Sequence, residues 1–164
     1  MVHKQEKVTH PFPPLCDSES RVLILGSFPS AVSREQGFYY ANRTNRFWPV
    51  LSEVFEEEIT DRAEFCHRHH LALWDVIASC TISGSSDASI HDAVPNPIAD
   101  LVKDLPVKKI FTTGKLAYRL YERYIDCGIE VIGLPSTSSA NARMSLEDLV
   151  SEYRKIRIYA EQKN

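Results

Sequence analysis

The stretch that decides the fold runs from Arg21 to Ser27 and reads RVLILGS. Its apolar residues follow one another without interruption and stop at Gly26, which is the pattern of a strand buried on both faces. Strands of this kind occur in parallel sheets, because helices then cover both faces of the sheet. The segment therefore predicts an α/β protein with a parallel sheet at its centre.

Segments of helical and strand periodicity alternate along the rest of the chain. Helices are expected near 45–55, 60–69, 97–105 and 115–124 and from 145 onward; strands are expected at 71–78, 108–114 and 129–135. Asn96 is a candidate cap for the third of these helices, and Ser145 and Asp148 have capping-box spacing at the last. Strands separated by helix-length connections predict a three-layer α/β/α fold with a short, mainly parallel central sheet.

The ends of this pattern define the expected domain limits. Residues 1–20, rich in proline and polar groups, are expected to form an N-terminal arm without regular structure, and residues 21–164 a single domain. The stretch 79–96 is interpreted as a loop. Ligands bind such sheets at the carboxyl ends of the strands, so the loops after Gly26, Ala78, Thr112 and Leu134 are the candidate functional segments.

Composition restricts the function classes. The 164 residues are 43% hydrophobic and 25% charged, as in one compact soluble domain. No apolar run approaches the roughly 18 residues of a membrane span, and a protein inside the cell is expected, without membrane partners. The net charge of -3 means that any nucleic-acid binding must come from a local patch.

Common catalytic signatures are absent or incomplete. There is no G-x-G-x-x-G and no G-x-S-x-G, and the TTGK stretch of residues 112–115 lacks the upstream glycine of a phosphate-binding loop. The four cysteines form no C-x-x-C pair, and the CHRHH cluster of residues 66–70 is better explained as a solvated helix end than as a metal site. A site without metal or cofactor is expected.

Two loop regions carry the remaining candidates. The first contains GSFPS at 26–30 and YYANRTNRFW at 39–48, and the second contains LPSTSSANAR at 134–143. Backbone amides, hydroxyls, carboxamides, tyrosine rings and arginines with little negative charge suit a flat aromatic base and a phosphodiester. The alternative is that Tyr39 and Tyr40 close the edge of the core and that the serines only turn the chain.

The same motifs, in the same order and spacing, resemble the two active-site motifs of the uracil-DNA glycosylase superfamily. Within it the chain is most similar to the hypoxanthine-DNA (deoxyinosine) glycosylase branch, the sixth family, also in LWDV at 73–76 and GSSD at 84–87. The resemblance extends from about Arg21 to the last helix. It implies a monomeric base-excision repair enzyme without cofactors, whose partner is DNA containing a deaminated base.

The resemblance assigns roles to the first loop position by position. Phe28 stands where mismatch-specific relatives have a catalytic asparagine, so the polar group is expected from Asn45, with Asn42 as its rival. Tyr40 matches the aromatic residue on which the flipped base stacks. The base-binding set is therefore Gly26, Ser27, Phe28, Pro29 and Tyr40.

The second loop is expected to contact DNA. The residues with this role are Pro135, Ser136, Thr137 and Ser138, which match the second motif, together with Arg143 near the start of the last helix. Relatives often begin this motif with histidine or asparagine, and Leu134 replaces that polar group.

The implied reaction is hydrolysis of an N-glycosidic bond, with hypoxanthine as the first candidate base. No active-site lysine is evident apart from Lys115 near a strand end, so a monofunctional enzyme is expected. Two alternatives remain: a uracil- or mismatch-specific DNA glycosylase and a noncatalytic module that binds modified bases.

Overall fold

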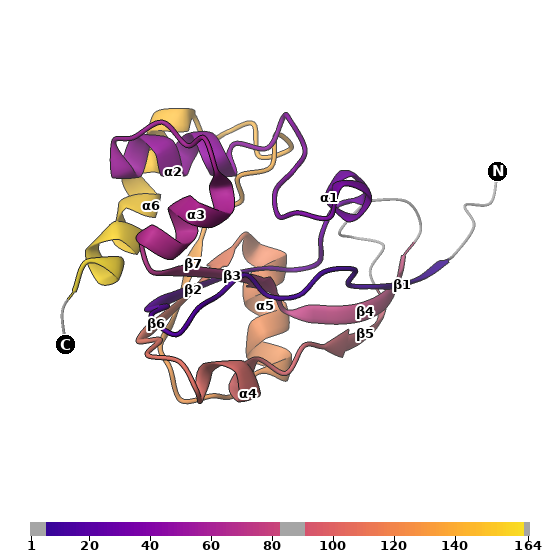
Figure 1. Ribbon diagram of the computed structural model, residues 1–164. Coiled ribbons are helices and arrows are strands. Elements are labelled where there is room, and N and C mark those ends of the chain that lie inside the picture. The colour runs from indigo at the N-terminus through magenta and orange to yellow at the C-terminus, as the bar shows by residue number, and fades with distance from the viewer. Residues whose placement is uncertain (1–5, 83–90, 163–164) are drawn as a thin grey trace.

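A four-stranded parallel sheet forms the centre of the computed structural model, which describes residues 6–82 and 91–162 (Figure 1). The strand order is β3-β2-β6-β7, with β3 at Leu71–Asp75, β2 at Val22–Gly26, β6 at Lys109–Thr113 and β7 at Val131–Leu134. β2 lies between β3 and β6, and all five of its residues are buried. The prediction made from RVLILGS is confirmed.

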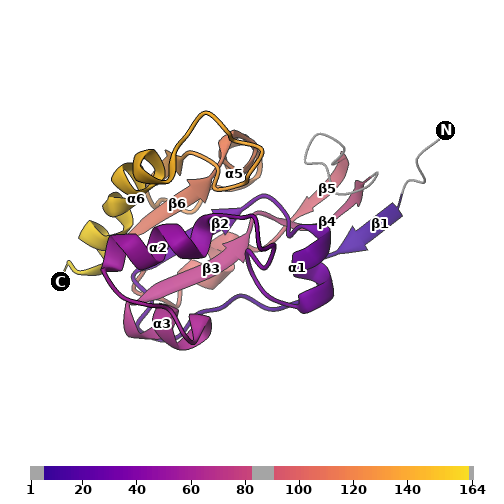
Figure 2. The same ribbon diagram turned by 90° about the horizontal axis from the view of Figure 1, so that it is seen from above.

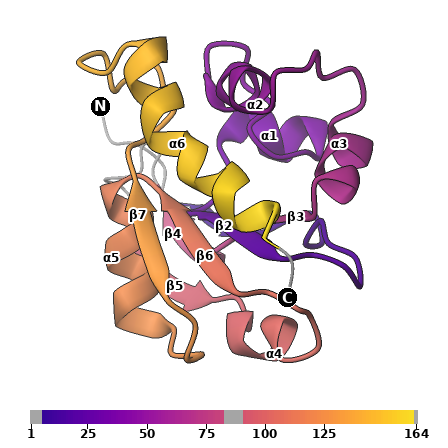
Figure 3. The same ribbon diagram turned by 90° about the vertical axis from the view of Figure 1, so that its left-hand side faces the viewer.

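Helices cover both faces of this sheet (Figures 1 and 3). One face carries α2 (Phe47–Phe55), α3 (Arg62–Arg68) and α6 (Leu146–Ala160), and the other carries α4 (Ile98–Val102) and α5 (Lys115–Tyr124). A short helix, α1 (Ala31–Gln36), follows β2. The expected three-layer α/β/α arrangement is confirmed.

The core lies between the sheet and its helices. Its largest fully enclosed side chains come from the strands and from α2, α3, α4 and α6; they include Tyr153, Phe47, Phe65, Phe111, Leu23, Ile24, Leu51 and Ile98. Burial of side chains of this size stabilises the fold by about 1.5–3 kcal/mol each relative to exposure.

The helix cap predicted from the sequence is confirmed at α6 and is wrong at α4. Ser145 and Asp148 form the expected capping box at the start of α6. Asn96 does not cap α4, whose N-cap is Pro97; its side-chain Nδ2 donates to the carbonyl oxygen of Asp75 at 2.9 Å. The Asn96 side chain therefore pairs with the last carbonyl group of β3 and not with the first N–H groups of α4.

A second, antiparallel sheet corrects two expectations. Its order is β1-β4-β5, formed by Glu6–Thr9, Ile77–Ile82 and His91–Pro95, and Figure 2 shows it beyond one end of the parallel sheet. The arm is therefore not free of regular structure, and the stretch 79–96 is not simply a loop; residues 83–90, including the GSSD match, lie outside the described residues.

The predicted strand 71–78 is also divided between the two sheets. β3 ends at Asp75, and β4 begins at Ile77 and pairs with β1. Within the described residues β1 pairs with β4 alone, about 70 positions away, so local sequence does not predict it.

Candidate active site

A cleft of about 450 Å³ opens at the carboxyl ends of β2, β3 and β6. Most of the residues singled out in the two loops line it: Gly26, Ser27, Phe28, Pro29, Tyr40, Asn42, Asn45, Ser136, Thr137 and Ser138. Pro135 and Arg143 do not line it. The fold thus brings together segments more than 90 positions apart at the edge where α/β sheets bind ligands.

Gly26 lines the cleft at the end of β2. A Cβ atom at this position would lie 2.5 Å from Asp75 Oδ1 and 3.3 Å from Tyr40 Oη. Glycine is therefore required by close approach, since a side chain would displace the carboxylate. Beyond it, the backbone N–H groups of Ser27 and Phe28 donate to no acceptor in the described part of the chain, and they follow directly on the strand end.

Tyr40 is held firmly as a wall of the cleft. Its ring stacks on Phe47 with centroids 3.7 Å apart and planes 16° apart, and its hydroxyl is 3.0 Å from Thr113 Oγ1. Burial raises the pKa of the Tyr40 hydroxyl far above its usual range, and the Asp75 carboxylate adds to that shift, so the hydroxyl is neutral. Its φ of 51° is uncommon for a bulky residue and is a kind of strain that clusters at functional sites.

Both candidate asparagines already use their side-chain oxygens. Asn45 Oδ1 accepts hydrogen bonds from the Phe47 N–H at 2.9 Å and from Thr137 Oγ1 at 2.8 Å. Asn42 Oδ1 accepts from the N–H and the hydroxyl of Thr44 at 2.9 and 2.8 Å. These bonds use both lone pairs of each carbonyl oxygen. The NH₂ group of each side chain has no hydrogen-bond partner among the described residues and is the polar group available to a ligand.

Arg46 fastens the second loop to the first. Its guanidinium donates to the carbonyl oxygens of Met144, Ser138 and Asn141, and its backbone N–H donates to the carbonyl of Thr137 at 2.9 Å. It is also the N-cap residue of α2, which begins at Phe47 and so starts two residues after Asn45. One cation therefore sets the position of the hydroxyl loop relative to Asn45.

The two expected DNA-contact residues outside the cleft have different environments. The Pro135 carbonyl accepts a hydrogen bond from Tyr153 Oη at 2.5 Å, which anchors the start of the loop to α6. Arg143 is exposed and forms no ion pair with any residue in the described ranges. Its guanidinium is available to a ligand.

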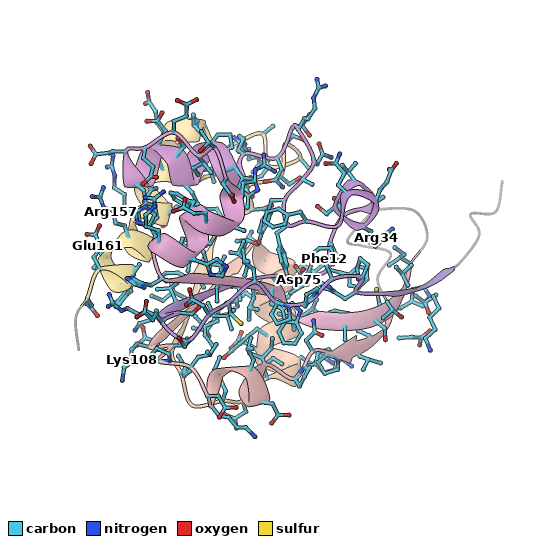
Figure 4. The ribbon with its side chains drawn as sticks, in the orientation of Figure 1. Phe12, Arg34, Asp75, Lys108, Arg157 and Glu161 are labelled. Atoms are coloured by element: carbon cyan, nitrogen blue, oxygen red, sulfur yellow. The ribbon has the colours of Figure 1, made fainter. Side chains whose placement is uncertain are left out.

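Asp75 and His10 were given no role from the sequence, although Asp75 lies in the LWDV segment of the family resemblance. Asp75 is opposite Gly26 in the β2–β3 register and lines the cleft, and Figure 4 shows it near the middle of the molecule. Its Oδ2 is 2.8 Å from Nε2 of His10, and the two side chains are only 6% and 4% exposed. Burial raises the pKa of Asp75, and the hydrogen bond from His10 opposes that shift. In the sequence the carboxylate is hidden within an apolar segment; a charged residue there is the signal that could have revealed it.

Members of the histidine cluster at the end of α3 have structural partners. His69 Nε2 is 2.7 Å from Glu57 Oε1, and Arg68 forms a 2.6 Å bond to the same carboxylate. These hydrogen bonds lower the pKa of Glu57 to about 2. Cys66 is buried, and nowhere in residues 6–82 and 91–162 do three potential metal ligands gather.

Comparison with known proteins identifies the family. The model of the uracil DNA glycosylase superfamily matches residues 13–157. The chain belongs to the uracil DNA glycosylase superfamily. A hypoxanthine DNA glycosylase of Methanosarcina acetivorans is 32% identical over 140 residues, covering 82% of this chain and 89% of the relative. One of Methanosarcina barkeri is 32% identical over 139 residues, covering 80% and 87%.

A solved structure gives the same assignment. A Methanosarcina acetivorans protein determined by solution NMR, provisionally named a uracil DNA glycosylase, matches with a TM-score of 0.79 and 31% identity, covering 92% of this chain and 97% of that one. The superfamily membership expected from the motifs is confirmed. None of the described helices has the length and apolarity needed to cross a membrane.

Phe28 lines the cleft without contributing a hydrogen-bonding group from its side chain. It is 8% exposed, and the Arg34 guanidinium lies 5.6 Å from the centre of its ring. A phenyl group packed in this way supplies shape but neither a donor nor an acceptor. The polar chemistry of the cleft therefore depends on its other residues.

Proposed function

We propose that this chain is a monofunctional DNA glycosylase that hydrolyses the N-glycosidic bond of deaminated bases, hypoxanthine in deoxyinosine first. The observation that carries the proposal is the convergence of both loops on one cleft in a chain whose relatives are named hypoxanthine DNA glycosylase. The cleft volume of about 450 Å³ is within the range of small-molecule sites. DNA containing a deaminated base is the proposed partner.

The reaction replaces the bond between the base and C1′ by a bond from water to C1′. The electron pair of the breaking bond leaves with the base, and the sugar acquires oxocarbenium character. Water adds to C1′, and the proton that it releases neutralises the departing base, which gives the free base and an abasic site. The base must first be extruded from the duplex into the cleft.

The N–H groups at the end of β2 are suited to the charge on the departing base. The N–H groups of Ser27 and Phe28 have no acceptor in the described part of the chain and lie at a strand end that borders the cleft, and fixed donors of this kind stabilise developing negative charge. Tyr40 supplies the flat wall for stacking, which is worth about 1–3 kcal/mol per base. No lysine lines the cleft in the described part of the chain, which supports hydrolysis without a covalent imine.

Asn45 is the proposed water-positioning residue. Its oxygen is held by Phe47 and Thr137, so the free NH₂ group would hold the water oxygen and leave one lone pair directed to C1′. A neutral amide does this without the cost of burying an ion. Asn42, whose oxygen is tied to Thr44, remains the rival.

Two variants separate the roles of the amide groups. Asn45→Ala should lower single-turnover base release by about 10²-fold or more, the scale for one preorganised polar group, with little change in DNA binding. Asn45→Asp keeps an acceptor for Phe47 and Thr137 but loses the NH₂ donor, so it should be similarly impaired. If both variants release base at a rate within a few-fold of wild type and Asn42→Ala does not, Asn42 is the residue that positions the water.

The direct test of the proposed activity is single-turnover release of base from matched oligonucleotides containing inosine, uracil or xanthine. Release of hypoxanthine at the highest rate supports the proposal, and a higher rate on uracil assigns the enzyme to uracil instead. Binding of all three without release identifies a noncatalytic module. We also expect the protein to act as a monomer within the cell, where its DNA substrate resides, and sedimentation with and without DNA tests the monomer.

A further inference from the structure

The two loop regions around the cleft are positively charged, although the chain as a whole is negative. Residues 26–48 and 134–145 contain four arginines and one acidic residue, Glu35, so their net charge is +3. The net charge of the whole chain is -3, and the remaining residues therefore carry -6. Positive charge concentrated in this way on an acidic protein indicates a site for a polyanion.

Of these four arginines, Arg34 lines the cleft itself. Its Nη1 donates to the carbonyl oxygen of Pro29 at 2.9 Å, and its guanidinium lies 5.6 Å from the centre of the Phe28 ring. These contacts hold the half-buried side chain in place. Within residues 6–82 and 91–162, its Nε and Nη2 groups have no hydrogen-bond acceptor and no carboxylate pairs with it. The cation is therefore held in position but not neutralised.

Arg34 and the second loop lie on opposite sides of the cleft. Arg34 belongs to α1, which Figure 2 shows beside β4, and Ile82 of β4 lines the cleft as well. The chain enters β4 from β3, which forms one edge of the parallel sheet, whereas the second loop follows β7 at the other edge. Figure 4 shows Arg34 on the α1 side of Asp75. A nucleotide that enters the cleft therefore passes between Arg34 and the second loop.

Two further arginines are on the side of the second loop. Arg143 is part of that loop, and Arg43 precedes Thr44, whose hydroxyl oxygen lies 3.3 Å from Ser139 Oγ. Both arginines are exposed and have no carboxylate partner among the described residues. Positive charge is thus present on both sides of the mouth.

We propose that Arg34 binds a phosphate of the damaged strand, on the side of the extruded nucleotide opposite to the phosphate contacts of the second loop. The proposal rests on the proposed function and adds a DNA contact from α1. Arg34 lies between the two parts of the first loop region, 26–30 and 39–48, and was given no role from the sequence.

The geometry of an extruded nucleotide accounts for contacts on both sides. Its sugar remains joined to the strand through two phosphates, and these diverge to the two sides when the base enters a cleft. A guanidinium group presents N–H donors in a fixed fork that matches two oxygens of a phosphate. Because Arg34 uses Nη1 for Pro29, the edge formed by Nε and Nη2 is the one left for this two-point contact.

Single neutral phosphates test the contact directly. Methylphosphonate replaces each phosphate in turn within three nucleotides on either side of 2′-fluoro-deoxyinosine, whose fluorine slows loss of the base. Wild-type binding should weaken about tenfold or more at the phosphate that Arg34 contacts, and Arg34→Gln should lose nothing further there. On unmodified DNA, Arg34→Gln should itself bind about tenfold more weakly. Arg143→Ala should show the same insensitivity at a phosphate on the other side of the lesion.

The salt dependence of binding and a matched variant separate charge from packing. Arg34→Gln should reduce the slope of log K against log salt by about 1, whereas Arg34→Lys should keep the slope and lose about threefold in affinity, because lysine cannot make a two-point contact. Arg123 is the matched control, since its guanidinium also lies over an aromatic ring, 5.3 Å from that of Tyr124, but at the C-terminal end of α5. Arg123→Gln should leave affinity, slope and base release unchanged.

Two results would overturn the inference through the position of the contact. Loss of base release in Arg34→Gln with an unchanged slope, and with every methylphosphonate as harmful as in the wild type, would assign Arg34 to the packing of Phe28 or to the base. An insensitive phosphate on the same side of the lesion as that of Arg143→Ala would also overturn it. Thermal unfolding identifies a misfolded variant, and Arg34→Met, which keeps the apolar stem against Phe28, replaces Arg34→Gln in that case.

The remaining outcomes distinguish the inference from the proposed function. If the wild type releases hypoxanthine while Arg34→Gln binds as tightly as the wild type, the inference fails and the function stands. If the wild type binds DNA with the expected pattern but releases no base, the proposed function fails and the inference stands.

Discussion

Replacing Arg46 by alanine should destabilise the protein and disorganise the cleft together. The guanidinium donates to three carbonyl oxygens of the second loop, those of Met144, Ser138 and Asn141. Hydrogen bonds from a charged group contribute about 1.5–3 kcal/mol each, but the half-buried site lets water replace part of this. We therefore expect the free energy of unfolding to fall by about 2–4 kcal/mol, which corresponds to a Tm lower by about 4–16 °C in a domain of this size.

The assay combines thermal unfolding with single-turnover release of hypoxanthine. The rate for Arg46→Ala should fall even at temperatures where the variant is folded, because the Thr137 hydroxyl that holds Asn45 belongs to the released loop. Arg46→Lys retains the positive charge but cannot donate to all three carbonyl oxygens, so its Tm and its rate of base release should lie between those of wild type and Arg46→Ala. Arg43→Ala removes an exposed neighbouring cation and is the matched control for stability. A Tm within 1 °C of wild type for Arg46→Ala would refute this account of the loop.

Four further changes test other parts of the structure. Gly26→Ala should abolish measurable base release while reducing unfolding free energy by about 1–3 kcal/mol, since its Cβ would lie 2.5 Å from Asp75 Oδ1; unchanged rates would contradict this geometry. Tyr40→Ala should weaken lesion capture in a binding titration, whereas Tyr40→Phe should retain most activity; equal impairment would assign the role to the hydroxyl. Arg143→Ala should weaken binding to damaged and undamaged DNA alike and reduce the slope of log K against log salt by about 1; an unchanged slope with a lower Tm would point to a structural role. The native pKa of Glu57 lies below its ordinary value, so its carboxylate stabilises the fold above about pH 4.5 and this stabilisation is lost as the pH falls from about 4.5 to 2. Glu57→Gln should therefore lose less unfolding free energy than the wild type over that pH range. Identical pH dependence of urea unfolding in the two proteins would exclude this contribution.

The sequence by itself determined the layered fold and the two loops. Uninterrupted apolar residues in Val22–Gly26 identify a strand that is buried on both of its faces. Ser145 and Asp148 identify the start of α6. These signals are local, because burial pattern and capping depend on residues within a few positions of one another. The family motifs were equally readable, since they consist of contiguous residues.

Only the tertiary structure determined which side chains reach the cleft and which of their polar atoms are already hydrogen-bonded. β1 exists through its pairing with β4, and Asp75 reaches the cleft because the strand register sets it opposite Gly26. The oxygen of Asn45 is occupied by a hydroxyl 92 positions away, and His10 is 65 positions from the carboxylate that it holds. Such contacts depend on which distant segments become neighbours, so the identity of each side chain was visible in the sequence, but the atom that it leaves free for a substrate was not.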